Sequence, residues 1–229
     1  MKVLVTGGGG FLGKAIVKLL RERGDQVRSF SRSEHAALAE LGVEHCRGEL
    51  SDAEAVKQAA RDCELVFHVA AKAGVWGPHA EFYQANVLGT RHVIAACRQH
   101  GIRRLVYTSS PSVVFDGSDM EDVDESVPYP EHYEAFYPQT KAEAERLVLQ
   151  ANDESLATVA LRPHLIWGPE DNHLVPRILE RGAKGALRRI GKRECLADTI
   201  YIDNAARAHI QAADRLEIEI GRASCRERV

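Results

Sequence analysis

Hydrophobic positions recur with two different periods along the first two thirds of the chain. Short apolar runs rich in β-branched and aromatic residues indicate buried strands, and the segments between them carry apolar residues at helical spacing. The predicted strands span residues 2–5, 26–30, 43–46, 64–70, 104–109 and 158–161. The predicted helices begin at residue 11 and at the capping-box pattern Ser51 to Glu54, and span 33–41, 87–100 and 138–151. This alternation predicts an α/β protein with a doubly wound parallel sheet and helices on both faces.

The first predicted strand runs directly into a glycine-rich turn and a helix. Residues 6–13 read Thr-Gly-Gly-Gly-Gly-Phe-Leu-Gly, so the spacing fits G-x-G-x-x-G from Gly8 or T-G-x-x-G-x-x-G from Thr6. Backbone N–H groups and the positive end of the helix dipole would face an anion there, and the missing side chains let it come close. A flexible linking turn is the alternative, but the flanking strand and helix favour the pyrophosphate of a dinucleotide. The combination predicts a Rossmann-type sheet.

Composition narrows the class of protein without identifying a partner. The 229 residues are 45% hydrophobic and 28% charged, which suits one soluble globular domain. A net charge of -3 gives no electrostatic footprint for nucleic acid, and no apolar run is long enough to span a membrane. The first apolar run is too short for a signal peptide. Five cysteines without a C-x-x-C pair and ten histidines without ligand spacing predict no metal site and no disulfides, and they suit the cytoplasm.

A tyrosine and a lysine four residues apart are candidates for proton transfer. Tyr137 and Lys141 lie on one face at the start of the predicted helix. A neighbouring ammonium favours the phenolate, so Lys141 is expected to lower the pKa of Tyr137 toward the range useful for acid–base catalysis. By itself this spacing also fits a solvated helix face, and its weight comes from its place after the fifth strand. Hydroxyls at residues 108–112 end that strand, and they either bind a substrate oxygen or form an ordinary Ser/Thr-rich turn.

The end of the second predicted strand bears on the choice of cofactor. In NAD-binding proteins of this fold an acidic residue there takes the ribose 2′-OH. This chain has Ser31 and Arg32 instead, with no carboxylate in residues 29–33. A serine can hydrogen-bond a 2′-phosphate and a guanidinium pairs with it, so NADP(H) is predicted to be preferred over NAD(H).

Eight short motifs occur in a fixed order along the chain. They occupy residues 6–13, 68–71, 86–90, 107–110, 137–141, 161–163, 168–169 and 201–204. Together they resemble the extended short-chain dehydrogenase/reductases, the superfamily of nucleotide-sugar epimerases and 3β-hydroxysteroid dehydrogenases. The resemblance implies that Tyr137 is the catalytic acid/base and that Lys141 tunes it and holds the nicotinamide ribose. It also implies that Ser110, rather than Ser109, is the catalytic serine.

The same resemblance implies the remaining cofactor contacts and the glycine register Gly7, Gly10 and Gly13. Pro163 should border the nicotinamide, and Asn86 matches a structural asparagine near the site. Glu49 departs from the aspartate that is usual at the adenine edge. With Ser31 and Arg32 included, the expected contacts are Gly7, Gly10, Phe11, Leu12, Gly13, Ser31, Arg32, Glu49, Leu50, Ala70, Ala71, Lys72, Asn86, Tyr137, Lys141 and Pro163.

Further stretches narrow the resemblance within the superfamily. Residues 71–77, 151–162, 166–169, 171–174 and 198–209 are similar to bacterial 2-alkyl-3-oxoalkanoate reductases of olefin biosynthesis. This similarity implies NADPH-dependent reduction of an apolar small-molecule carbonyl substrate. The substrate it implies is a β-keto acid with two long alkyl chains. Trp76 and Trp167 either line an apolar acyl site or belong to the core.

Three other functions fit parts of the pattern. They are a 3β-hydroxysteroid or sterol dehydrogenase, an NAD-dependent nucleotide-sugar epimerase or dehydratase, and a redox-sensing regulator without turnover. The missing carboxylate at Ser31 argues against the epimerase. The presence of Tyr137 and Lys141 argues against the regulator.

The motifs divide the chain into three parts. Residues 1–162 are expected to form the NADP-binding Rossmann domain, and 163–218 its remaining elements and the start of a substrate-binding lobe. Residues 219–229 are charged and aperiodic and resemble a translated sequencing adapter, with a natural basic tail as the alternative. The substrate lobe is therefore expected to be truncated, with apolar surface exposed and activity at risk. At full length the family resemblance implies a homodimer.

Overall fold

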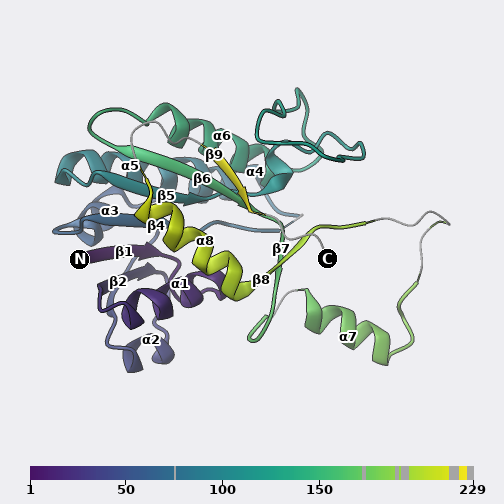
Figure 1. The fold of residues 1–229 in the computed structure, drawn as a ribbon, viewed down its shortest axis with the longest axis horizontal. Helices are drawn as coiled ribbons and strands as arrows, with labels where there is room; N and C mark the ends of the chain where they lie inside the picture. Colours follow the sequence, from purple (N-terminus) through teal and green to yellow (C-terminus); the bar gives the residue numbers. More distant parts are fainter. Residues whose placement is uncertain (75, 172–173, 189–190, 192–195, 217–221, 226–229) are drawn as a thin grey trace.

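A parallel β-sheet forms the centre of the molecule (Figure 1). The computed structural model describes residues 1–74, 76–171, 174–188, 191, 196–216 and 222–225. Within them the sheet has seven strands in the order β3-β2-β1-β4-β5-β6-β9, and all neighbouring pairs are parallel. The strands are β1 (Lys2–Thr6), β2 (Gln26–Ser31), β3 (Glu44–Arg47), β4 (Leu65–His68), β5 (Arg104–Thr108), β6 (Ala157–Pro163) and β9 (Arg222–Cys225). A second sheet pairs β7 (Leu165–Trp167) with β8 (Thr199–Tyr201).

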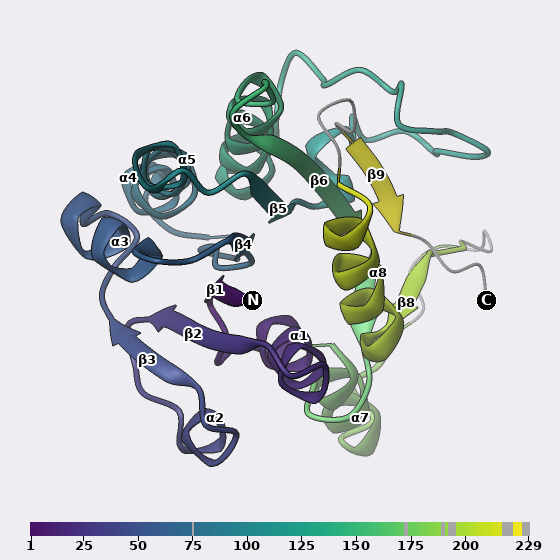
Figure 2. The same cartoon turned by 60° about the vertical axis from the view of Figure 1, so that its left-hand side comes forward.

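Helices cover both faces of this sheet, as Figure 2 shows. They are α1 (Phe11–Glu22), α2 (Ala36–Glu40), α3 (Ala53–Ala60), α4 (His79–Phe82), α5 (Gly89–His100), α6 (Phe136–Gln150), α7 (Val175–Ala183) and α8 (Ile202–Asp214), with the π-helix η1 (Tyr83–Leu88) and the 3₁₀-helix η2 (Pro111–Val113). Successive strand residues point to opposite faces. Val3 and Val5 therefore pack with α1 and α8, and Leu4 packs with α3 and α5. The two apolar layers explain why the central strands are hydrophobic at nearly every position.

The predicted fold class and the six predicted strands are confirmed, with differences at some ends. The strand predicted to reach residue 70 ends at His68, because the N–H groups of Val69 and Ala70 both donate to the Thr6 side-chain hydroxyl instead of a backbone carbonyl of a neighbouring strand. The capping box predicted from Ser51 is wrong. Asp52 is the N-cap of α3, and its carboxylate accepts a hydrogen bond from the Ala55 N–H at 3.0 Å.

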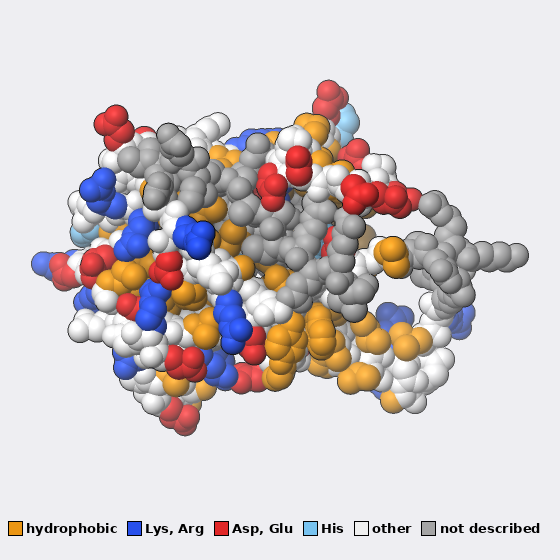
Figure 3. All heavy atoms as spheres, in the orientation of Figure 1, with side chains coloured by type: hydrophobic (Ala, Val, Ile, Leu, Met, Phe, Trp, Pro, Cys, Tyr) orange, Lys and Arg blue, Asp and Glu red, His pale blue; other side chains and the backbone are white. Residues whose placement is uncertain are grey.

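The part of the chain after β6 exposes apolar side chains. Helix α7 has no buried residue and lies apart from the main sheet (Figure 1). Hydrophobic atoms gather on this side of the molecule (Figure 3), and the exposed residues there are Leu165, Trp167, Ile178, Leu179 and Leu187. Trp76 is 90% exposed, which excludes the core as one of the two alternatives for this residue.

The segment predicted to be a non-native tail is described only in part. Residues 219–221 and 226–229 lie outside the described residues, and β9 runs parallel to β6. Among the described helices, none combines the length and apolar character needed to cross a membrane.

Candidate functional site

The glycine turn joins β1 to α1 at the carboxyl edge of the sheet. Gly7 has a φ of +72°, a left-handed conformation that side chains rarely adopt, and its N–H donates to the Phe30 carbonyl at 2.8 Å. Gly10 is the N-cap of α1 and has no side chain to cap the helix. The first-turn N–H groups of α1 therefore keep the anion-binding character expected of this motif.

Close backbone contacts leave no room for side chains in this turn. A methyl group built on Gly13 would lie 2.1 Å from the Gly7 carbonyl oxygen. One built on Gly7 would lie 3.0 Å from Ala70, which follows β4. The turn thus lies tightly between α1 and the end of β4, and the residues present fit a pyrophosphate lying along the backbone.

Tyr137 and Ser110 are brought together at the carboxyl end of β5. Ser110 follows β5 and caps η2, and Tyr137 lies in the first turn of α6, which contacts η2. Burial raises the pKa of the Tyr137 phenol above its ordinary value of 10, and a hydrogen bond with the Ser110 side chain lowers it by less. The net shift is upward, so the predicted lowering of this pKa is wrong.

The reason lies in the direction of the Lys141 side chain. Lys141 is buried, and its ammonium donates to the Thr108 carbonyl at 2.6 Å and lies 4.1 Å from the centre of the Tyr107 ring. Burial lowers the pKa of Lys141 to about 7, and the charge of Glu145 one turn further along α6 raises it by a smaller amount. A lysine in this position is half-neutral near neutral pH, and it is held by the strand rather than by the phenol.

This lowered pKa predicts a pH-dependent contribution to stability. Between pH 7 and the ordinary lysine value of 10.5, the unfolded chain binds a proton that the folded chain releases. The free energy of unfolding should therefore rise with pH across this window, and Lys141→Met should flatten the rise. Urea unfolding of both proteins at several pH values measures the difference. An identical slope for both would contradict the assignment.

A buried ion pair lies beside Lys141. The Arg162 guanidinium, at the end of β6, contacts the Glu145 carboxylate through its Nη2 at 2.5 Å and its Nε at 3.1 Å. The Tyr129 hydroxyl donates to the same carboxylate at 2.6 Å. Burial acts to raise the pKa of Glu145, but these hydrogen bonds and the charge of Arg162 leave it below its usual range. The pair fixes α6 to the strand that ends in Pro163.

Asn86 is buried on the π-helix η1, a type of helical bulge frequent at functional sites. Its Oδ1 accepts from the Lys72 N–H at 2.7 Å, and its Nδ2 donates to the Lys72 carbonyl at 3.1 Å and to the Thr140 hydroxyl at 3.0 Å. One amide thus holds both the segment after β4 and the start of α6. The remaining expected contacts, Phe11, Leu12, Leu50, Ala71 and Pro163, lie at the same carboxyl edge of the sheet.

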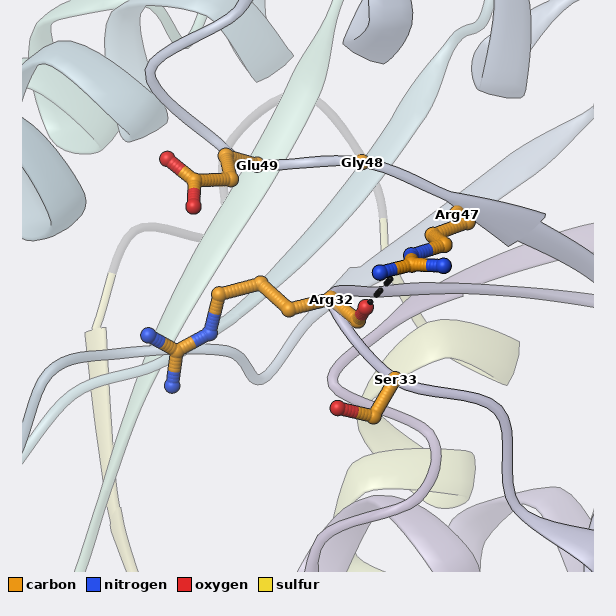
Figure 4. Close-up of a pocket in the computed structure, with 5 residues that line it drawn as sticks. All are labelled: Arg32, Ser33, Arg47, Gly48 and Glu49. Atoms are coloured by element: carbon orange, nitrogen blue, oxygen red, sulfur yellow. Dashed lines mark hydrogen bonds between the residues drawn. The ribbon is translucent and has the colours of Figure 1, made fainter.

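A cavity of about 410 Å³ opens at the carboxyl ends of β2 and β3. Its lining residues are Arg32, Ser33, Arg47, Gly48 and Glu49 (Figure 4). Ser31 is not among them, and its hydroxyl donates to the Ser33 carbonyl at 2.8 Å. Arg47 is the residue that sequence reasoning missed. Its register partner across the β2–β3 pair is Ser31, so strand pairing was the signal that could have found it.

Comparisons with known proteins agree with this arrangement. The 3-beta hydroxysteroid dehydrogenase/isomerase family matches residues 4–228. The 2-alkyl-3-oxoalkanoate reductase of Stenotrophomonas maltophilia is 55% identical, covering 94% of this chain and 66% of that protein. The enzyme of the same name from Shewanella oneidensis is 51% identical, covering 91% of this chain and 56% of that protein. The chain therefore spans less than two thirds of the length of these relatives. The structure of Thermus thermophilus UDP-glucose 4-epimerase with NAD is 30% identical and has a TM-score of 0.81, covering 98% of this chain and 77% of that chain.

Proposed function

Because the chain belongs to the 3-beta hydroxysteroid dehydrogenase/isomerase family, we propose that it is an NADP(H)-dependent oxidoreductase that reduces a 3-oxo group to a hydroxyl. Its substrate is a long-chain 2-alkyl-3-oxoalkanoate. The observation that carries the proposal is the phenol of Tyr137, held protonated by burial beside Ser110 at the carboxyl end of β5. Identity above 50% to two 2-alkyl-3-oxoalkanoate reductases supports the substrate class.

The proposed mechanism assigns each side chain one task. NADPH, when bound, supplies the hydride to the carbonyl carbon. Ser110 donates a hydrogen bond to the substrate carbonyl oxygen and orients it toward Tyr137. Tyr137 donates its phenolic proton to that oxygen as negative charge develops on it. A raised pKa suits this direction, because the phenol stays protonated at neutral pH and is ready to act as an acid. Lys141 would hold the nicotinamide ribose and help return a proton to the phenolate.

Two arginines support the preference for NADP(H). Within the described residues, neither Arg32 nor Arg47 forms an ion pair. The Arg47 Nε donates to the Arg32 carbonyl at 3.1 Å, which ties the end of β3 to the turn after β2. A 2′-phosphate on the ribose would find two cations and the Ser33 hydroxyl around the cavity of Figure 4. We infer that Ser33, rather than the engaged Ser31, makes the hydroxyl contact.

Arg47→Met should therefore weaken NADPH binding by about 10- to 150-fold and leave NADH binding nearly unchanged, since a hydrogen bond to a charged group contributes about 1.5–3 kcal/mol. Fluorescence titration with each dinucleotide measures both affinities. Arg61→Met is the matched control, because Arg61 is exposed at the end of α3 and away from the cavity. Tighter binding of NADH than NADPH by the unmodified chain would contradict the assignment of the cofactor.

The reaction itself is tested by consumption of NADPH. A long-chain 2-alkyl-3-oxoalkanoate should drive NADPH oxidation and give the 3-hydroxy acid, and UDP-glucose should not. Conversion of UDP-glucose to its 4-epimer would contradict the proposal.

Cys46, Cys63 and Cys97 are free thiols, which supports a reducing, cytoplasmic setting for this enzyme.

A further inference from the structure

Four polar residues are buried under the site and are linked by hydrogen bonds, three through their side chains and the fourth through its backbone carbonyl. They are Thr6 at the end of β1, His68 at the end of β4, Asn86 in η1 and Thr90 in α5. The His68 ring lies between the two threonines, with Nδ1 2.8 Å from the Thr6 hydroxyl and Nε2 2.9 Å from the Thr90 hydroxyl. No step of the proposed reaction uses His68.

The direction of each hydrogen bond follows from the carbonyl group at one end. The Thr90 hydroxyl donates its single proton to the backbone carbonyl of Asn86, one helical turn earlier, at 2.6 Å. It can therefore only accept from His68, so the His68 proton is on Nε2. The Nδ1 atom of a neutral ring is then an acceptor, and it takes the Thr6 hydroxyl proton.

The other end of the chain of hydrogen bonds agrees with this direction. Once the Thr6 hydroxyl donates to His68, its lone pairs accept from the N–H groups of Val69 at 3.1 Å and Ala70 at 3.2 Å. A second proton on the His68 ring would point at a hydroxyl that is already fully engaged. Burial accordingly lowers the pKa of His68 to about 3, so the neutral ring is the form present at working pH.

This chain of hydrogen bonds ends at the Asn86 backbone carbonyl, and the Asn86 side-chain amide makes a second set of hydrogen bonds that reaches the proposed catalytic helix. This amide holds both backbone polar groups of Lys72 and also the Thr140 hydroxyl. The Thr140 hydroxyl in turn donates to the Phe136 carbonyl at 2.7 Å, in the turn that carries Tyr137. Every donor along this path, from the Thr6 hydroxyl before the glycine turn to the Thr140 hydroxyl on α6, has an acceptor.

We propose that His68 is a positioning residue: as a neutral ring with its proton on Nε2, it links Thr6 to the Thr90–Asn86 pair and so holds the cofactor segment 69–72 in register with the first turn of α6. The inference rests on the proposed function, because the register matters only if a dinucleotide lies against 69–72 and Tyr137 acts on its substrate. A fixed supporting set of hydrogen bonds of this kind keeps reacting groups within a fraction of an ångström of their productive positions.

The test removes the Thr90 hydroxyl, which accepts from His68, and keeps a side chain of the same shape. Thr90→Val deletes both hydrogen bonds of the hydroxyl, and Thr90→Ser keeps them. Thr158→Val is the matched control, because Thr158 is equally buried and its hydroxyl donates to the Val148 carbonyl at 2.8 Å, away from the site. Two lost hydrogen bonds of about 1 kcal/mol each predict amide exchange about 30-fold faster in segments 69–72 and 136–141 for Thr90→Val only. NADPH affinity should fall by a similar factor, and Thr90→Ser should restore both.

The outcomes separate this role from general stabilisation and from the proposed function. If Thr90→Val and Thr158→Val show equal amide-exchange rates in segments 69–72 and 136–141, the positioning role is overturned. Nitrogen NMR of labelled histidine should show His68 with a protonated Nε2 and a bare Nδ1, and the opposite tautomer overturns the direction. A chain that binds neither NADPH nor NADH contradicts the proposed function instead, and the exchange and NMR results still decide whether His68 links the segments.

Discussion

Tyr137→Phe is expected to reduce turnover by about 10²- to 10⁴-fold while NADPH affinity changes little. The substitution removes the only atom that the proposed mechanism uses to protonate the developing alkoxide, and it keeps the aromatic ring. Steady-state reduction of a 2-alkyl-3-oxoalkanoate measures the first quantity and cofactor titration the second. Turnover within a few-fold of the unmodified chain would remove Tyr137 from the mechanism.

Tyr133→Phe is the matched control for this experiment. The Tyr133 hydroxyl donates to the Val113 carbonyl at 3.0 Å, so its loss costs one hydrogen bond near the site and no proposed chemistry. The raised pKa of Tyr137 also sets the expected pH profile. Reduction should persist through neutral pH and decline only above the ordinary tyrosine value of 10, where the phenol ionises.

The fold was predictable because local signals and the sheet topology agree. Apart from the edge strand β3, the strands of the sheet through β6 contain short apolar runs, and each is followed by a helix or a turn with a recognisable start. Most of the parts that were missed follow β6. Strands β7 and β8 have three residues each, too few for an alternating pattern to show. Helices α7 and α8 do carry apolar residues at helical spacing, so their omission is a failure to apply this signal rather than its absence.

The candidate site was predictable as a set of residues and less so as a set of interactions. The i and i+4 spacing of Tyr137 and Lys141 suggests mutual contact, but spacing does not show that the Thr108 carbonyl offers the ammonium a nearer acceptor. Ser31 has the right place on β2, yet its hydroxyl is engaged by Ser33. Arg47 is 15 residues from Arg32 and meets it only because β3 pairs with β2. Side-chain direction and strand register decide such contacts, and neither is local in sequence.

Glu145→Leu is expected to lower the free energy of unfolding by about 3–5 kcal/mol. The substitution leaves the buried Arg162 guanidinium without its counter-charge and the Tyr129 hydroxyl without its acceptor. Urea unfolding measures the loss. The exposed pair Glu180 and Lys184 on α7 is the control, because Glu180→Gln should change stability by only about 0.5 kcal/mol.

The double variant Glu145→Leu/Arg162→Met separates the value of the ion pair from the cost of breaking it. Apolar residues of similar volume can replace a buried pair at little cost, so the double variant should recover most of the lost stability.

The pKa of Glu145 is lowered in the folded state, so the contribution of Glu145 to stability is present above its ordinary pKa of 4.5 and is lost as pH falls through the folded value. Stability of the double variant should therefore fall less steeply below pH 4.5 than that of the unmodified chain. Because Glu145 also raises the pKa of Lys141, removing it should leave more of that lysine neutral at pH 7 and weaken its proposed contact with the ribose. A double variant as unstable as Glu145→Leu alone would show that α6 depends on the pair itself rather than on the absence of an unpaired charge.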